Sequence, residues 1–129
     1  MSPVTLSMPV VLQAEPTPLA IIGTVGLLAL FLSLTAHLAA RNVLGDVPAV
    51  TALGVGIVPA LVSVGTQLFS VPGGIGVLVA LVLDGLAIHY LYGQSRRTSA
   101  YITAIHVIIT IILGTVIFGI LTIAMTAPG

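Results

Sequence analysis

Apolar residues fill four long segments of the chain, and short segments rich in polar or turn-forming residues separate them. The apolar segments cover about residues 19–40, 49–70, 73–92 and 101–125. A helix needs roughly 20 apolar residues to cross about 30 Å of hydrocarbon. Each segment reaches that length, so the pattern predicts four transmembrane helices.

The connections between these segments are short, with the sequences RNVLGDVP, SVPGG and GQSRRTSA. Each contains glycine, proline or charged residues, which is typical of a turn at a membrane surface. Connections of this length force each helix to run antiparallel to the one before it. We therefore expect an all-α membrane protein, an up-down bundle of four transmembrane helices.

The composition agrees with lipid as the solvent of most of the chain. Hydrophobic residues make up 58% of the sequence and charged residues only 5%, whereas a soluble domain carries about a quarter charged residues. Zero net charge without a basic patch argues against nucleic-acid binding. The absence of cysteine excludes disulfides, thiolate catalysis and cysteine metal sites.

Three arginines predict the orientation of the bundle. Arg41 lies in the first connection, and Arg96 and Arg97 lie in the third. Because basic residues accumulate in cytoplasmic loops, we expect loops 41–48 and 93–100 in the cytoplasm of a cell-membrane protein and both termini outside. The same arginines are candidates for contact with anionic lipid headgroups.

The N-terminal segment, residues 1–18, is interpreted as an exterior tail and not as a signal peptide. It lacks a basic region, and Pro3 and Pro9 interrupt its short apolar run. Residues 19–129 then form a four-helix transmembrane domain.

Asp84 is an acidic residue inside the third predicted span. A rise of 1.5 Å per residue, counted from the loop arginines, puts it about 13 Å deep, near the midplane. Thr110 reaches the same level and Ser33 nearly does. Intramembrane carboxylates often mark ion or proton pathways, and a neutral carboxyl that bonds a neighbouring helix is the structural alternative. Asp84, Thr110 and Ser33 are therefore the candidates for an ion or proton relay.

Pro59 interrupts the second predicted span. Proline has no N–H and clashes with the carbonyl four residues earlier, that of Val55, so we expect a helix kink. A carbonyl released in lipid needs a hydrogen-bond donor. Neutral Asp84, Ser33 or Thr110 is expected to supply it.

The histidines His37, His89 and His106 lie at a shallower level, about 6–8 Å inside the cytoplasmic boundary by the same count. Two histidines at equal depth on different helices can ligate a haem. His37 with His89 or His106 is therefore a candidate pair for haem b, with the loop arginines near the propionates. A three-histidine zinc site is a further alternative. Without such a group, we expect no cofactor and no metal.

The run TAHLAARNVLGDVP, residues 35–48, and the four-span pattern that ends in TAPG resemble small multi-pass membrane proteins of haloarchaea. The resemblance covers most of the chain. That family has no assigned activity, so the resemblance implies no functional residues.

No catalytic motif supports an enzyme: the chain has no His-Glu-x-x-His pattern and no glycine-rich phosphate loop that precedes a lysine. Our leading hypothesis is a multi-pass protein that acts through helix–helix contacts, as an accessory or structural component of a membrane assembly or as a homo-oligomer. The alternatives are a proton- or ion-linked transport element centred on Asp84 and a haem-binding electron-transfer subunit. The expected partners are the lipid bilayer and other membrane subunits or a second copy.

Overall fold

The computed structural model describes residues 17–127, and the predicted N-terminal tail lies almost wholly outside them. The described residues form four α-helices, each long and apolar enough to cross a membrane. The prediction of an all-α protein with four candidate spans is therefore confirmed. The helices are α2 (Pro18–Leu44), α3 (Ala49–Leu68), α4 (Gly73–Tyr92) and α5 (Arg96–Thr126).

Two helices extend beyond the predicted spans. The last turn of α2 and the first turn of α5 are polar, so the search for apolar segments did not include them. α2 continues through Arg41 to Leu44, and α5 begins at Arg96. Ser95 caps α5, and its hydroxyl oxygen accepts from the backbone N–H of Thr98 at 3.2 Å. The three arginines therefore lie at helix ends and not in loops. Because α5 begins earlier than predicted, its residues lie opposite other levels of the neighbouring helices than the prediction gave them.

Glycine residues end the two helices that lead into the charged connections. Gly93 follows α4 in the left-handed conformation with φ of 64°, which glycine adopts without a steric penalty. Gly45 follows α2 with φ of 86°, and its N–H donates to the carbonyl of Arg41 at 3.0 Å. Both turns bring the next helix back alongside the previous one.

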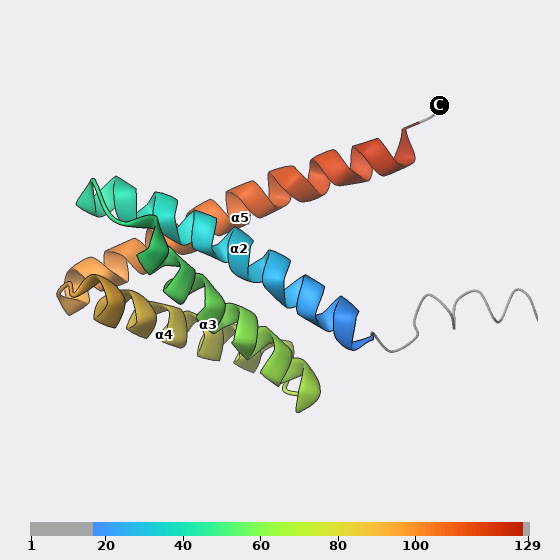
Figure 1. Ribbon diagram of the computed structural model, residues 1–129, viewed down its shortest axis with the longest axis horizontal. Coiled ribbons are helices and arrows are strands. Elements are labelled where there is room, and N and C mark those ends of the chain that lie inside the picture. Colours follow the sequence, from blue (N-terminus) through green and yellow to red (C-terminus); the bar gives the residue numbers. More distant parts are fainter. Residues whose placement is uncertain (1–16, 128–129) are drawn as a thin grey trace, which may run out of the picture.

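The four helices form a ring in which α2 and α4 each pack against both α3 and α5. Figure 1 shows that the helices converge where the α2–α3 and α4–α5 connections lie, and that α5 separates from the others toward its C-terminus. We call the converging side the packed end and the side with the α3–α4 turn the open end. The core lies at the packed end and consists of Ala36, Ala39, Ala40, Ala52, Val55, Ile88 and Ile102.

The contact between α2 and α3 depends on Gly56. A Cβ atom at this position would collide with Ser33 and would lie 2.6 Å from the carbonyl oxygen of Ala29. Small residues allow the backbones of membrane helices to approach this closely. Ser33 thereby faces α3, and its hydroxyl donates to the carbonyl of Ala29 at 2.6 Å within its own helix.

α3 continues through Pro59 as one helix from Ala49 to Leu68. The prediction that Ser33, Thr110 or Asp84 donates a hydrogen bond to the carbonyl of Val55 is wrong for the described residues. Each of these three side chains has another partner. Ser33 donates within α2, Thr110 donates to Thr35, and Asp84 contacts His106.

Candidate functional site

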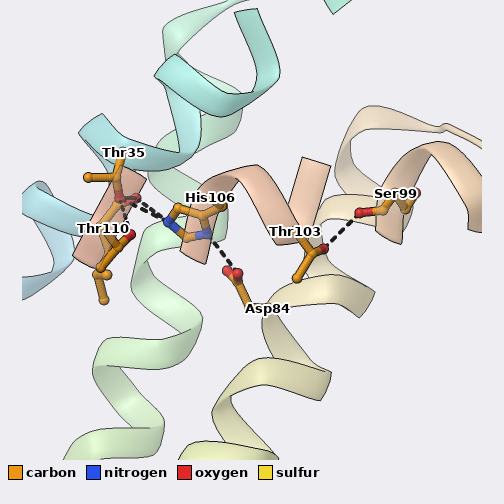
Figure 2. A network of polar contacts seen from close by, with 7 residues as sticks. Thr35, Asp84, Ser99, Thr103, His106 and Thr110 are labelled. Atoms are coloured by element: carbon orange, nitrogen blue, oxygen red, sulfur yellow. Dashed lines mark hydrogen bonds and ion pairs between the residues drawn. The ribbon is translucent and has the colours of Figure 1, made fainter. Parts of the chain in front are cut away.

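A chain of hydrogen bonds joins α2, α4 and α5 at the level of Asp84. The Nδ1 atom of His106 lies 2.6 Å from Oδ2 of Asp84, and its Nε2 atom lies 2.9 Å from Oγ1 of Thr35. The hydroxyl of Thr110 donates to Oγ1 of Thr35 at 3.0 Å. Figure 2 shows His106 between Asp84 on one side and the two threonines on the other. We call these four residues the polar chain.

The polar chain is buried inside the ring. Asp84 is 5% exposed, His106 3% and Thr35 0%. Polar groups at membrane depth must find partners inside the protein, and most atoms of the chain do. One atom does not: Oδ1 of Asp84 is buried and has no hydrogen-bond partner among the described residues.

The hydrogen-bond directions indicate which ring nitrogen of His106 is protonated. The hydroxyl of Thr35 donates to the carbonyl of Leu32 at 3.0 Å, so Oγ1 of Thr35 accepts from Nε2. Nε2 also lies 3.2 Å from the carbonyl oxygen of Leu32, which can only accept. Both contacts require an N–H, and on this basis we assign a proton to Nε2.

A second proton lies between Nδ1 of His106 and Oδ2 of Asp84, since a lone pair and a carboxylate would repel each other at 2.6 Å. The contact is either an imidazolium–carboxylate pair or an imidazole that accepts from a carboxylic acid. Both forms have zero net charge and interconvert when one proton moves along one hydrogen bond. A neutral pair suits the bilayer interior, where an isolated charge is unfavourable.

An apolar cavity of about 250 Å³ opens beside the pair. Its polar lining consists of Asp84, His106 and Thr110, and most of its wall consists of Leu32, Pro59, Val77, Leu81, Val107 and Ile111. A second cavity, of about 170 Å³, shares Pro59, Val77 and Ala80 with the first and continues to Ser63 and Thr66. The second cavity lies nearer to the open end than the first.

The model of the family DUF7473, described as a family of unknown function, matches residues 15–128. This match includes all four helices and the whole polar chain. The chain belongs to this family. Neither a curated protein nor a solved structure matches it. The haloarchaeal origin suggested by the sequence remains a prediction, and the function of this DUF7473 protein has to be argued from its geometry.

The partner of Asp84 in the DUF7473 chain is His106, whereas the depth count had paired Asp84 with Thr110. That count assigned residues 96–100 to a loop, but they form the first turn of α5. Because α5 begins a turn earlier, His106 and not Thr110 lies level with Asp84. Thr110 belongs to the polar chain through Thr35, one step away from the carboxyl.

The remaining candidate residues do not converge on one site. Ser33 faces α3, Nδ1 of His89 lies 3.3 Å from Oγ of Ser99, and Nδ1 of His37 is buried with no partner among the described residues. No group of three or more His, Cys, Asp or Glu residues between 17 and 127 can hold a metal, so the three-histidine zinc alternative is wrong. Both ring nitrogens of His106 are hydrogen-bonded, and His106 therefore does not fit as a haem ligand.

The arginines lie at the packed end of the DUF7473 chain. Arg41 is in the last turn of α2, and Arg96 and Arg97 form the start of α5. Arg96 also lines a cavity of about 350 Å³ together with His89 and Tyr90. Contact with lipid headgroups remains a prediction for these residues.

Thr35 is a residue of the site that the sequence reasoning missed. It lies in the buried part of α2 with Ala36, Ala39 and Ala40. Small residues at helical spacing mark close contacts between membrane helices. From that alanine pattern, the position of Thr35 at a helix interface could have been predicted.

Thr35→Val is expected to lower the free energy of unfolding by about 1 kcal/mol. Valine keeps the shape of threonine but removes the acceptor shared by His106 and Thr110. Thermal unfolding in detergent, followed by circular dichroism, measures the change. Thr122→Val is the matched control on α5, since this exposed hydroxyl donates at 2.8 Å to Phe118 in its own helix. Equal losses in the two variants would contradict the role given to Thr35.

Proposed function

We propose that this DUF7473 protein is a proton-linked transport element centred on Asp84 and His106. The observation that supports this most directly is the 2.6 Å contact between a buried acid and a buried imidazole, both of which line a cavity. Chains of acidic and histidine side chains inside membranes are typical of pumps and transporters. The pair also supplies the second titratable group that a relay from Asp84 alone would lack.

The proposal uses the difference between the two ends of the bundle. Toward the open end, one cavity borders Asp84 and a second cavity, which shares part of its lining, borders Ser63 and Thr66. Toward the packed end, Ile88 and Ile102 are fully buried, and the cavity of about 350 Å³ beside His89 and Arg96 has neither Asp84 nor His106 in its lining. Transport requires a second state in which the packed end opens, with the two states in equilibrium.

The proposal includes an orientation in the cell membrane. The packed end holds Arg41, Arg96 and Arg97, and basic residues accumulate on the cytoplasmic side. Loops 41–48 and 93–100 are therefore placed in the cytoplasm, and both termini outside. The open end then faces the exterior.

Asp84→Asn is expected to reduce proton uptake by proteoliposomes at least tenfold, because an amide cannot exchange the shared proton. The measurement uses a pH-sensitive dye inside the vesicles and a potassium diffusion potential as the driving force. Asp46→Asn is the matched control, since Asp46 is an exposed acid in the α2–α3 connection, and its uptake should equal that of the wild type. Wild-type uptake by a folded, inserted Asp84→Asn protein would refute the proposal.

A second candidate is the accessory role through helix–helix contacts, in a membrane assembly or a homo-oligomer. It is favoured by α5, which has 31 residues and is about 46 Å long at 1.5 Å per residue. Residues 107–126 include no buried side chain, and Figure 1 shows this part of α5 apart from the other helices. Native mass spectrometry of gently extracted protein tests this role. A multiple of 13.1 kDa or the mass of a second polypeptide would support it, and a lone monomer would contradict it.

A further inference from the structure

A cavity at the packed end contains polar groups that the proposed function does not use. It has a volume of about 350 Å³ and lies between α4 and α5, with Arg96, His89 and Ser99 in its lining. Neither Asp84 nor His106 lines it, and Figure 2 shows Ser99 apart from the polar chain. The cavity is therefore a separate feature of the α4–α5 interface.

The polar groups of this cavity are accessible and free to bind a ligand. The ion pair of the described residues is His106–Asp84, so none of their acids neutralises the exposed guanidinium of Arg96. Nδ1 of His89 lies 3.3 Å from the hydroxyl oxygen of Ser99, which leaves Nε2 without a partner among residues 17–127. Nε2 is not among the buried unpaired atoms of that part of the chain, so a ligand can reach it.

The hydrogen bond to Ser99 makes Nε2 of His89 a donor. The hydroxyl of Ser99 has no other acceptor among the described residues, so it donates to Nδ1. A neutral imidazole that accepts at Nδ1 carries its proton on Nε2, and on this basis we assign the proton there. Arg96 and His89 therefore both present N–H groups and suit a ligand that accepts hydrogen bonds.

The charge at the packed end selects an anion. Arg41, Arg96 and Arg97 lie at this end, and the acid there among the described residues is Asp46 in the α2–α3 connection. Positive charge is therefore in excess. A guanidinium binds a phosphate group with two parallel N–H···O bonds, and Nε2–H of His89 can donate a third.

The lining of the cavity becomes apolar toward the middle of the membrane. Arg96 and His89 lie next to the α4–α5 connection, at the membrane surface. Leu86 and Val82 also line the cavity and lie about one and two turns before His89 in α4. They are 45% and 60% exposed, as suits side chains that face lipid. A phospholipid has the same order of groups, with its phosphate at the surface and its acyl chains below, whereas a soluble anion has no apolar part.

We propose that the cavity between α4 and α5 binds one anionic phospholipid, with its phosphate on Arg96 and His89 and an acyl chain along Leu86 and Val82. Basic pockets between transmembrane helices bind anionic headgroups in this way. The specific contact belongs to Arg96, because Arg97 does not line the cavity. The polar chain takes no part in this site, so the inference is independent of proton transport.

Native mass spectrometry of the purified full-length protein in detergent, titrated with dioleoyl phosphatidylglycerol, tests this inference. The expected result is saturable binding of one lipid per chain. Dioleoyl phosphatidylcholine has the same chains and a phosphate but no net charge, and it should bind roughly fivefold more weakly. Glycerol phosphate has the anionic group without the chains and should show no saturable binding at the same concentrations.

Matched variants locate the site. Arg96→Gln should weaken phosphatidylglycerol binding about tenfold, because hydrogen bonds from a charged donor are lost. Arg97→Gln removes the neighbouring exposed arginine outside the cavity lining, and its affinity should equal that of the wild type. Ala100→Phe should also weaken binding, since it fills the cavity without a change of charge. Ala124→Phe is the same substitution at an exposed position near the other end of α5 and should leave the affinity unchanged.

Each contrary result overturns a stated part of the inference. Absence of saturable phosphatidylglycerol binding to the wild type, or equal binding of phosphatidylcholine, overturns the anionic lipid site. Glycerol phosphate binding as tight as that of the lipid would identify a soluble phosphate ester as the ligand and overturn the assignment to a lipid. Wild-type affinity in Arg96→Gln or in Ala100→Phe, or an equal loss in Arg97→Gln, overturns the location between α4 and α5.

Discussion

His106→Leu is expected to lower the free energy of unfolding by roughly 3 kcal/mol. The substitution removes the group that contacts Oδ2 of Asp84, and Oδ1 already lacks a partner. A buried acid without any hydrogen bond is far less favourable than a paired one, since neither lipid nor the apolar wall replaces the lost donor. Chemical or thermal unfolding in detergent, followed by circular dichroism, measures the loss.

The double variant Asp84→Leu/His106→Leu is expected to regain most of that stability. Replacement of a buried ionisable pair by apolar residues is often neutral or stabilising, because no polar group is left unpaired. The double variant should at the same time show no proton uptake. If it is no more stable than His106→Leu alone, the unpaired carboxyl of Asp84 is not the cause of the loss.

Gly56→Ala is expected to lower the free energy of unfolding by about 2–3 kcal/mol. The added Cβ collides with Ser33 and lies 2.6 Å from the backbone oxygen of Ala29. Backbone atoms cannot move aside by a change of rotamer, so α2 and α3 have to separate. Thermal unfolding in detergent is again the measurement.

Gly65→Ala provides the control for this substitution. Gly65 lies on the same helix, and a Cβ there meets nothing within 4 Å, so its stability should be unchanged or slightly higher because alanine favours helix. Equal melting of the two variants would show that the α2–α3 contact does not depend on Gly56. Because Thr35 lies on α2 next to this contact, Gly56→Ala should also weaken the hydrogen bond between Thr35 and His106.

Much of the architecture follows from local sequence alone. The length and apolarity of each segment predicted the four helices, since a span is a property of about 20 consecutive residues in one solvent. The third span is the clearest case: Pro72 and Gly93 flank it, and the predicted range 73–92 equals the observed α4. The position of Asp84 within a span was equally a matter of counting along the chain.

The partners inside the bundle were decided only by the tertiary structure. The level of a residue on one helix relative to the next helix depends on where each helix begins. Because α5 begins with a polar turn that the prediction assigned to a loop, His106 lies opposite Asp84 where Thr110 was expected. The side of the ring that a polar residue faces depends on which neighbour packs there. Ser33 and Thr35 lie two residues apart on α2, yet the first meets α3 and the second meets α5. The two side chains point to nearly opposite sides of the helix, and both are buried. Periodicity therefore separates them but does not say which neighbour each one meets, and only the packing of α2 between α3 and α5 makes Thr35 the one that completes the site.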